Sequence, residues 1–599
     1  MGPLVLWMAR LAAVVGFAVV LSTAFRTGWT RLSTDFPNYY TAAVAVRHHE
    51  PLPNFYDWTW FARQMNYAGI ENQLGGYVPQ SPATMLPMIP IAGFPPLTAK
   101  RIWLALDLIL LPAVIGILAR MTGVRWEVLA VLLLCGYRSL MTNFLFGQYY
   151  IFLLFLTTLT LDSFARNRDR LSGFLSGAAF GLKLYPGPLL IYFAARRAWT
   201  SVLAMAAGAA CVGGVALLLF GWSGIAYYLT HVLPRTLEGS SVDPYNPVTA
   251  TPNILLHKLF LREAELNPHP VFEAPWLFFF VRTAMQLGLL VFATLGVAWK
   301  ADPDRRRDLA WFLILLVLLS SSTATHTYIL LFAPVAVLLR GASLPKTLYL
   351  FASYSMMNLF PPPALFLKVW TLLLLFFVVG YDYLRAIETR WAMVALAAVV
   401  LFSAMDAQRR LKDYEAEPAR RYQEIAVVPG ALFSDYPVVT RCGIFYQSMM
   451  ARTGRQGYVL RWLHDGQIGT FDFGGNELRP VADGDGCGIE FEHVAHGRSM
   501  FLRLDPLTSR TEAAAAPAHP KPDDGVVSPD GKWRVRVRET ATSEQLWLED
   551  TAGGKAKVLA GGSCNNTSPA WELDSSAVIF ASDCGRAYGL PALYRAPVN

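Results

Sequence analysis

Long apolar runs, separated by polar connectors, occupy the first part of the chain. They recur from Leu4 to about Ala407, and many approach the roughly 20 residues that a helix needs to cross a bilayer. The remaining sequence is polar and contains frequent Gly and Asp. The pattern predicts a polytopic α-helical membrane domain at 1–407, a linker at 408–421 and a soluble domain at 422–599.

The apolar runs predict about thirteen spans. Arg10 interrupts the first run, Leu4 to Phe25, and many spans follow, so an uncleaved first span is favoured over a signal peptide. A Pro-rich run ending at Pro96 predicts a short, irregular second span. The others are expected at about 101–119, 126–140, 144–165, 171–194, 199–221, 275–299, 309–322, 325–340, 346–361, 363–385 and 390–407.

Basic connectors between the spans predict the orientation, because Lys and Arg prefer cytoplasmic loops. In the simple count, four such connectors are cytoplasmic, and the long connectors 26–80 and 222–274 face outward; the four are Arg196-Arg197, Lys300 to Asp308, Arg340 to Lys346 and Arg385 to Arg390. The basic loop 166–170 would then face outward. If 171–197 is instead a hairpin that dips in and returns, broken at 183–188, that loop becomes cytoplasmic. The sequence leaves both arrangements open.

The tail has the alternation of a β domain. Asp530-Gly531, after Ser528-Pro529, lies between alternating runs and predicts a hairpin turn. A looser copy, Ser568-Pro569-Ala570-Trp571, follows forty residues later, a period typical of propeller blades. The segment resembles the SPDG blades of bacterial periplasmic β-propellers, and we expect a partial propeller or a propeller-like sandwich.

Composition supports this division. The chain is 54% hydrophobic and 16% charged, which excludes an ordinary soluble protein, and its net charge of +8 comes from connectors beside spans, so no nucleic-acid partner is expected. Four of the six cysteines lie in the tail and would suit two disulfides of undefined pairing in an oxidising compartment: Cys442, Cys487, Cys564 and Cys584. By contrast, basic residues 409, 410 and 412, just after the last predicted span, favour a tail on the cytoplasmic side. We expect an extracytoplasmic tail.

The stretch from Leu32 to Ala43 contains the leading candidate for catalysis. Its only acid, Asp35, follows the first span and precedes Tyr39 and Tyr40, at a depth where aqueous and lipid-linked reactants meet. The alternative is that Asp35 only caps the next helix, since Asp is a favoured N-cap residue.

Polar residues within or beside spans are further candidates, because their burial in a membrane is costly. Lys183 could hold a phosphate or could snorkel to the interface, and His326 could donate to a phosphate or be an ordinary loop residue. Asp107 could pair with Arg101 or Arg138. Gln148 and Asn253 could bind a sugar hydroxyl or serve packing.

Several common motifs are absent from the sequence. It contains no Walker motif, no convincing GxGxxG after a strand, no HExxH and no GxSxG, so ATP-driven transport and serine hydrolysis lose support. No closely spaced pair of acids suggests a divalent metal. We expect no cofactor, and the sequence leaves the metal requirement open.

Taken in order, short motifs between residues 5 and 400 resemble glycosyltransferase family 87. They are Asp35-Phe36 with Tyr39-Tyr40, Tyr77 to Pro82 leading to Pro87 and Phe94-Pro95, Trp103, Gly147-Gln148, Gly177 to Lys183 with Tyr185-Pro186, Arg196 to Trp199, and His326-Thr327-Tyr328. The resemblance implies a GT-C fold similar to that of polyprenyl-phosphate-mannose-dependent mannosyltransferases. It does not extend to the tail.

What the resemblance implies is a multi-pass enzyme of the cell (inner) membrane and cell envelope. It would move a hexose or pentose, mannose favoured, from a polyprenyl-phosphate donor to a hydroxyl of a glycan or glycolipid on the extracytoplasmic side, with inversion. Asp35 would be the general base, Lys183 and His326 would stabilise the departing phosphate, and Tyr39 and Tyr40 would line the sugar site.

Two other classes remain open from the sequence. A transporter or flippase for lipid-linked sugars would also use buried polar residues, but it would be expected to show paired inverted repeats, and no convincing internal symmetry is present. A membrane-anchored glycan-binding protein would work through its tail, although so many spans exceed what anchoring needs.

Overall fold

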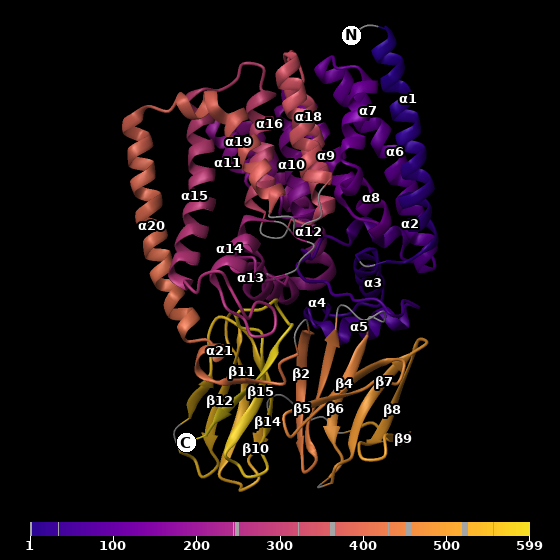
Figure 1. The fold of residues 1–599 in the computed structure, drawn as a ribbon, viewed down its shortest axis with the longest axis vertical. Helices are drawn as coiled ribbons and strands as arrows, with labels where there is room; N and C mark the ends of the chain where they lie inside the picture. The colour runs from indigo at the N-terminus through magenta and orange to yellow at the C-terminus, as the bar shows by residue number, and fades with distance from the viewer. Residues whose placement is uncertain are drawn as a thin grey trace.

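The computed structural model places a bundle of helices on top of a smaller β region (Figure 1). It describes residues 3–33, 35–243, 245, 249, 251–320, 323–359, 366–428, 431–450, 457–484, 486–517, 525–554 and 556–598. The N-terminus lies at the end of the bundle farthest from the β region, and the C-terminus lies within the β region. The prediction of a helical membrane protein with a C-terminal β domain is therefore confirmed.

The first half of the helical part begins with the long helix α1. Short helices α3, α4 and α5 then lie beside the β region, and α6 to α11 return to the bundle (Figure 1). Its helices are α1 (Pro3–Val20), α2 (Arg26–Thr30), α3 (Phe36–Arg47), α4 (Leu52–Phe55), α5 (Trp58–Tyr67), α6 (Pro96–Thr122), α7 (Trp126–Cys135), α8 (Tyr137–Phe146), α9 (Tyr150–Ala165), α10 (Asp169–Leu182) and α11 (Leu189–Ala195).

The second half has the same mixture of long and short helices. They are α12 (Trp199–Tyr227), α13 (Leu233–Glu238), α14 (Pro252–Phe260), α15 (Pro275–Trp299), α16 (Arg307–Leu319), α17 (Phe332–Leu338), α18 (Leu344–Leu359), α19 (Leu367–Arg385), α20 (Thr389–Glu415) and α21 (Pro418–Arg421). Two π-helical turns, Leu21–Phe25 and Tyr228–Val232, and two 3₁₀ turns, Leu86–Ile91 and Thr325–Leu331, connect or extend these helices.

The expected count of about thirteen spans is wrong. Among the described residues, six helices are long and apolar enough to cross a membrane, or seven if α7 and α8, bent by 74°, form one span. The six are Leu6–Thr30, Pro96–Thr122, Trp199–Glu238, Pro275–Trp299, Leu367–Arg385 and Thr389–Glu415. Other apolar runs fold as shorter helices inside the bundle. The buried α16, for example, has only 13 residues, and a helix that is apolar on every side is typical of a protein interior.

The basic connectors gather at one end of the bundle. Arg305 of the connector 300–308 forms an ion pair with Asp169 at 2.6 Å, and Asp308 forms one with Arg196 at 3.0 Å. Loops 166–170 and 196–197 therefore lie at the same end, and α10 and α11 run in and back between them. Of the two arrangements that the sequence allowed, the structure has the hairpin, and it breaks at Lys183 as that alternative required.

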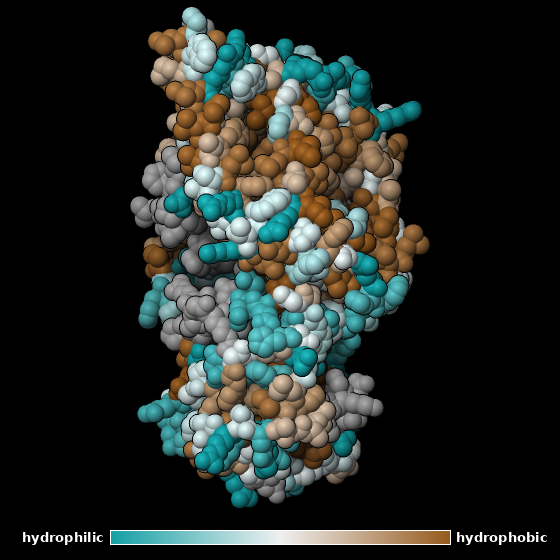
Figure 2. All heavy atoms as spheres, turned by 90° about the vertical axis from the view of Figure 1, so that its right-hand side faces the viewer, coloured by the Kyte–Doolittle hydropathy of each residue, from teal (hydrophilic) through white to brown (hydrophobic). Residues whose placement is uncertain are grey.

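Figure 2 shows hydrophobic residues covering much of the helical part, with hydrophilic residues at its far end and over much of the β region. Large apolar side chains on α1, α12 and α20 are exposed, including Trp7, Leu218 and Leu401. Such a wide apolar surface is typical of contact with lipid. The predicted linker 408–421 is helical, because α20 continues to Glu415 and α21 follows it. The Asp406–Arg410 ion pair, one helical turn apart, supports this continuation.

The β region consists of four antiparallel sheets of four strands among the described residues. The strands are β1 (Gln423–Ile425), β2 (Ala431–Thr440), β3 (Gly443–Met450), β4 (Tyr458–His464), β5 (Gln467–Phe471), β6 (Asn476–Ala482), β7 (Ile489–Ala495), β8 (Arg498–Asp505), β9 (Arg510–Ala513), β10 (Val526–Val527), β11 (Trp533–Glu539), β12 (Glu544–Asp550), β13 (Lys557–Ala560), β14 (Asn566–Trp571), β15 (Ala577–Ser582) and β16 (Ala592–Pro597).

Three sheets are simple meanders, β2–β5, β6–β9 and β10–β13, whereas the fourth has the order β1-β16-β15-β14. Four strands per sheet is the number found in propeller blades. The predicted hairpin is confirmed, because Asp530-Gly531 lies in the turn between β10 and β11. Its expected copy at 568–571 lies within strand β14 instead. Disulfides join Cys442 to Cys487 and Cys564 to Cys584.

The β region docks on the short helices that follow α3. The indole of Trp58, at the start of α5, donates to the main-chain oxygen of Tyr588 at 3.0 Å, and the hydroxyl of Tyr458 donates to the main-chain oxygen of Trp58 at 3.1 Å. Arg63 of α5 forms an ion pair with Glu492 of β7. The β region thus lies at the end of the bundle opposite the basic connectors (Figure 1).

Candidate functional site

Asp35 lies at the turn where the loop after α2 enters α3. Its backbone has φ 80° and ψ −60°, a positive φ that non-glycine residues rarely adopt and that costs on the order of 1–3 kcal/mol. The residue occupies the N-cap position, yet its side chain makes no capping hydrogen bond. The carboxylate instead accepts a hydrogen bond of 2.6 Å from the side-chain amide of Gln148. The unusual backbone therefore serves to aim this carboxylate at Gln148.

Gln148 is positioned by the sharp end of α8. Gly147 terminates that helix with φ 61°, and a Cβ there would lie 3.0 Å from the Cβ of Phe36, so this close approach favours glycine. The indole of Trp103 donates to the main-chain oxygen of Gln148 at 3.2 Å. The hydroxyl of Tyr39 donates to its side-chain oxygen at 3.0 Å. The amide group is thereby fixed with its NH2 toward Asp35.

Lys183 completes this chain of contacts from the break between α10 and α11. Its ammonium group donates to the Tyr39 hydroxyl at 3.3 Å and lies over the rings of Tyr39 and Tyr150, 5.4 and 5.0 Å from their centres. The Tyr150 ring in turn lies 4.9 Å from that of His326. Among the described residues, no carboxylate lies within ion-pair distance of Lys183. We call Asp35, Tyr39, Gln148, Lys183 and His326 the Asp35 cluster.

The electrostatics of Asp35 favour a carboxylate that can take up a proton. Burial raises the pKa of Asp35, and this effect outweighs the hydrogen bond from Gln148 and the positive charges of Lys183 and Lys100, which all lower it. A raised pKa brings a carboxyl closer to the range where general bases work at physiological pH.

Sequence reasoning missed Lys100, which is buried at the start of α6. Its ammonium group donates at 2.7 Å both to the main-chain oxygen of Arg31 and to that of Leu145. The hydroxyl of Ser33 also donates to Leu145, at 3.0 Å. Lys100 thus ties the loop before Asp35 to the helix end before Gln148. The pattern that could have revealed it is the basic pair 100–101 at the start of a span, where a buried cation needs a partner.

Two other candidates, Tyr40 and Asn253, lie away from the Asp35 cluster or have no partner. The hydroxyl of Tyr40 donates to the main-chain oxygen of Phe94 at 2.8 Å, away from the Asp35 cluster. Asn253 is buried on α14, and its side chain has no hydrogen-bond partner in the described part of the chain. An isolated bridge between Thr249 and Ala324 nevertheless joins the second long connector to the segment just before His326.

The expected pairing of Asp107 is not found. Arg101 donates instead to the main-chain oxygen of Trp29 at 3.0 Å, and neither carboxylate oxygen of Asp107 has a hydrogen-bond partner within the described ranges. Asp107 lies one helical turn after Trp103 on α6. Unlike Asp35, whose carboxylate accepts a hydrogen bond from Gln148, it has no side-chain partner among the described residues.

One group of acids has the spacing of a metal site. Carboxylate oxygens of Glu263, Glu265 and Glu424 lie within 4.8 Å of one another. The guanidinium of Arg586, however, lies 2.6 Å from Glu265, 3.4 Å from Glu263 and 3.9 Å from Glu424. The chain therefore supplies its own cation for this group of acids.

The Asp35 cluster combines a buried carboxylate with the ammonium group of Lys183, which lies a few side chains away. In the described residues, this ammonium group has no acidic partner. Such an arrangement can accept a proton at one atom and stabilise a negative charge at another. Aromatic rings and amide groups between them offer surfaces for a sugar.

One comparison with known proteins bears on the function. A family model for glycosyltransferase family 87 matches residues 80–325, so the resemblance found in the sequence is confirmed over that range and indicates a membrane glycosyltransferase. Gln148 and Lys183 lie inside the matched range, His326 lies directly after it, and Asp35 lies before it. No curated protein matches the chain.

A likeness to a solved structure is also found. The crystal structure of TolB from Acinetobacter baumannii matches with 20% identity and a TM-score of 0.13, over 28% of this chain. The match spans 44% of the length of that structure.

Proposed function

We propose that the protein is a GT-C-type glycosyltransferase that moves a sugar, mannose favoured, from a polyprenyl-phosphate carrier to an acceptor hydroxyl. The observation that carries the proposal is the Asp35 cluster: a buried carboxylate aimed by Gln148, with Lys183 nearby and without an acidic partner among the described residues. The family match indicates that the transferred group is a sugar.

In the proposed reaction, Asp35 takes the proton of the acceptor hydroxyl as its oxygen attacks the anomeric carbon. The bond from that carbon to the phosphate oxygen breaks at the same time, so the configuration inverts in a single displacement. Lys183 and His326 stabilise the negative charge that develops on the departing phosphate. Tyr39 and Gln148 contact the sugar. The proposal includes no resident cofactor.

The proposal places the reaction on the extracytoplasmic side of the inner membrane. Positive connectors favour the cytoplasm, and in this protein they gather at the end opposite α3, α5 and the β region. Two disulfides in the β region favour an oxidising compartment. Asp35 and the β domain would then both be periplasmic, and the acceptor would be a glycan or glycolipid of the cell envelope.

The test is Asp35→Asn in the full-length protein, assayed with a radiolabelled polyprenyl-phosphate sugar. The amide keeps the shape of the side chain but cannot accept the proton, so we expect release of free polyprenyl phosphate to fall by about 10²-fold or more while donor binding persists. Wild-type turnover in this variant would remove Asp35 from its role. Uptake of donor across vesicles without release of polyprenyl phosphate by the unmodified protein would instead indicate a transporter.

A further inference from the structure

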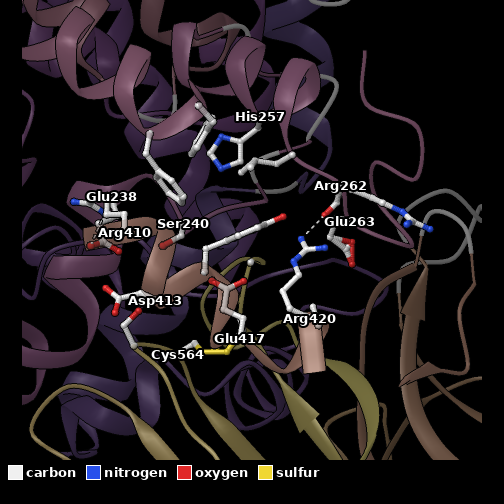
Figure 3. A pocket seen from close by; sticks show the side chains of 18 of the residues that line it. Glu238, Ser240, His257, Arg262, Glu263, Arg410, Asp413, Glu417, Arg420 and Cys564 are labelled. Carbon is white, nitrogen blue, oxygen red and sulfur yellow. Dashed lines mark hydrogen bonds and ion pairs between the residues drawn. A yellow bond between two sulfur atoms is a disulfide. The ribbon is translucent and has the colours of Figure 1, made fainter. Parts of the chain in front are cut away.

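A cavity of about 440 Å³ lies where the helical part meets the β region. Its walls come from α13, α14, α15, α20 and α21 on one side and from the Cys564–Cys584 disulfide and Tyr594 on the other (Figure 3). No residue of the Asp35 cluster lines it. The cavity is therefore separate from the proposed active site.

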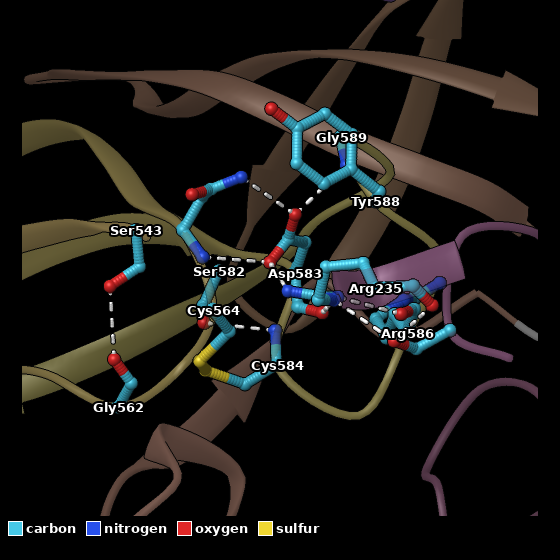
Figure 4. A network of polar contacts seen from close by, with 12 residues as sticks. Arg235, Ser543, Gly562, Cys564, Ser582, Asp583, Cys584, Arg586, Tyr588 and Gly589 are labelled. Atoms are coloured by element: carbon cyan, nitrogen blue, oxygen red, sulfur yellow. Dashed lines mark hydrogen bonds and ion pairs between the residues drawn. A yellow bond between two sulfur atoms is a disulfide. The ribbon is translucent and has the colours of Figure 1, made fainter. Parts of the chain in front are cut away.

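The cavity exists because the β region is docked. Arg235 of α13 donates to the carboxylate of Asp583 at 3.1 Å, and to the main-chain oxygens of Asp583 and Arg586, both at 3.1 Å (Figure 4). The main-chain nitrogen of Tyr588 donates to the main-chain oxygen of Ser240 at 2.9 Å. These bonds hold the turn after β15 against α13, and this turn closes one side of the cavity.

Among the described residues, arginines outnumber acids in the cavity lining by six to five. In the part of the chain that the structure describes, six contribute to it: Arg235, Arg262, Arg282, Arg409, Arg410 and Arg420. Most acids of the same lining have a partner, because Glu238 pairs with Arg410 at 3.1 Å, and Glu263 and Glu424 lie against Arg586. Arg235 pairs with Asp583, and Arg409 and Arg410 both pair with Asp406. The lining arginines without a carboxylate at ion-pair distance, among the described residues, are Arg262, Arg282 and Arg420.

Arg282 is the buried arginine of this lining that forms no ion pair among the described residues. Arg282 is only 7% exposed, and its guanidinium carbon lies 5.4 Å from the centre of the Phe278 ring. One guanidinium nitrogen donates to the main-chain oxygen of Glu238 at 3.1 Å, but within the described ranges no carboxylate lies within ion-pair distance of Arg282. A buried charge without a counter-ion is costly unless an anion binds beside it.

The remaining lining acids do not supply that counter-ion. Glu417 lies toward the disulfide (Figure 3), and burial raises its pKa to about 7, so much of it is neutral near neutral pH. Asp413 lies on the side of Arg410 and Glu238 in the same view and adds one negative charge there.

The position of the cavity indicates which anion is available. Trp276 and Leu277 are each 38% exposed in the first turn of α15, the residues just before the lining residue Phe278. Leu237, beside Glu238, and Phe272 are exposed as well. Exposed aromatic and apolar residues at the end of a span are typical of the membrane interface, where lipid headgroups lie.

We propose that this cavity binds the phosphate of an anionic lipid headgroup, with Arg282 as the principal contact. The acyl chains would leave the cavity past Trp276 and Leu277 into the bilayer. Since the walls come from both parts of the protein, the bound lipid would hold the β domain on the membrane surface.

Binding can be measured on the full-length protein in detergent with dioctanoyl phosphatidylglycerol as the probe. Dioctanoylglycerol, which lacks the phosphate, and inorganic phosphate, which lacks the lipid, form the comparison arms. We expect the unmodified protein to bind the phospholipid at least 10-fold more tightly than either. Equal binding of dioctanoylglycerol would overturn the anion site, and equal binding of inorganic phosphate would overturn the lipid as its source.

Arg282→Gln should weaken binding of the phospholipid at least 10-fold, and Arg282→Lys should restore part of it. The matched control is Arg390→Gln at the far end of α20, which removes an exposed arginine and should leave affinity unchanged. Unaltered affinity in Arg282→Gln would overturn the assignment. Because the three-ligand comparison uses the unmodified protein, it stands even if Arg282→Gln does not fold, and no arm depends on sugar transfer.

Discussion

Lys183 and Arg586 are both inward-facing cations, but their surroundings differ. Arg586, in the β region, lies against three carboxylates, of which Glu265 is as close as 2.6 Å. Lys183, at the break between α10 and α11, contacts a tyrosine hydroxyl and two aromatic rings. A cation whose charge is neutralised by the chain stabilises the fold. A cation left without an acidic partner in the described residues is ready for a ligand, and Arg282 belongs with Lys183 in this respect.

The largest effect on folding is expected from Arg586→Met. The substitution leaves Glu263, Glu265 and Glu424 close together without their cation, and removal of one partner from a buried ion pair costs about 3–5 kcal/mol. We expect the β region to unfold at markedly lower denaturant concentration and to become sensitive to protease. Arg595→Met, which removes the more exposed pair with Glu572, is the control and should cost far less. Equal losses would contradict the comparison.

Lys183→Met should have the opposite pattern. Because no acid is left unpaired, stability should change little, whereas donor affinity should fall about 10–100-fold, equivalent to about 1.4–2.7 kcal/mol. Binding of a polyprenyl-phosphate sugar to the purified protein measures the first quantity, and thermal unfolding measures the second. Loss of stability without loss of donor affinity would make Lys183 a structural residue like Arg586.

The smallest expected effect is a change of pH dependence in Lys100→Met. The charge of Lys100 lowers the pKa of Asp35, so its removal should raise that pKa further. A general base works only when deprotonated, and activity is lost as pH falls through its pKa. The acidic limb of kcat/KM should therefore move to higher pH.

Ser33→Ala is the control for this shift. It removes another hydrogen bond to Leu145 but no charge, and it should reduce activity without moving the acidic limb. An unmoved limb in Lys100→Met would mean that Lys100 acts only by holding the loop.

The broad division of the fold could be predicted from the sequence, because long apolar runs and strict alternation each favour one kind of element. The span count could not. Hydropathy does not distinguish a membrane span from a short buried helix such as α16, and the packing that decides between them is tertiary. The sequence also left open which side loop 166–170 faces, because that depends on tertiary packing. The ion pair between Arg305 and Asp169 places this loop at the same end as the connector 300–308.

The candidate site was predictable where polar residues interrupt apolar sequence, as at Asp35, Gln148 and Lys183. Lys100 was missed because it resembles an ordinary basic residue at the start of a span. The cavity around Arg282 could not be predicted, since its walls come from helices and from a β turn about 300 residues later in the sequence.

The fourth sheet gives the protein an order of assembly. Strand β16 lies between β1 and β15, so the first strand of the β region has no neighbour in its sheet until residues 592–597 have been made. During synthesis the helices would enter the bilayer long before that sheet closes. A chain halted shortly before residue 592 would reach the membrane with β1 unpaired and without Tyr594, one of the residues that line the arginine-lined cavity.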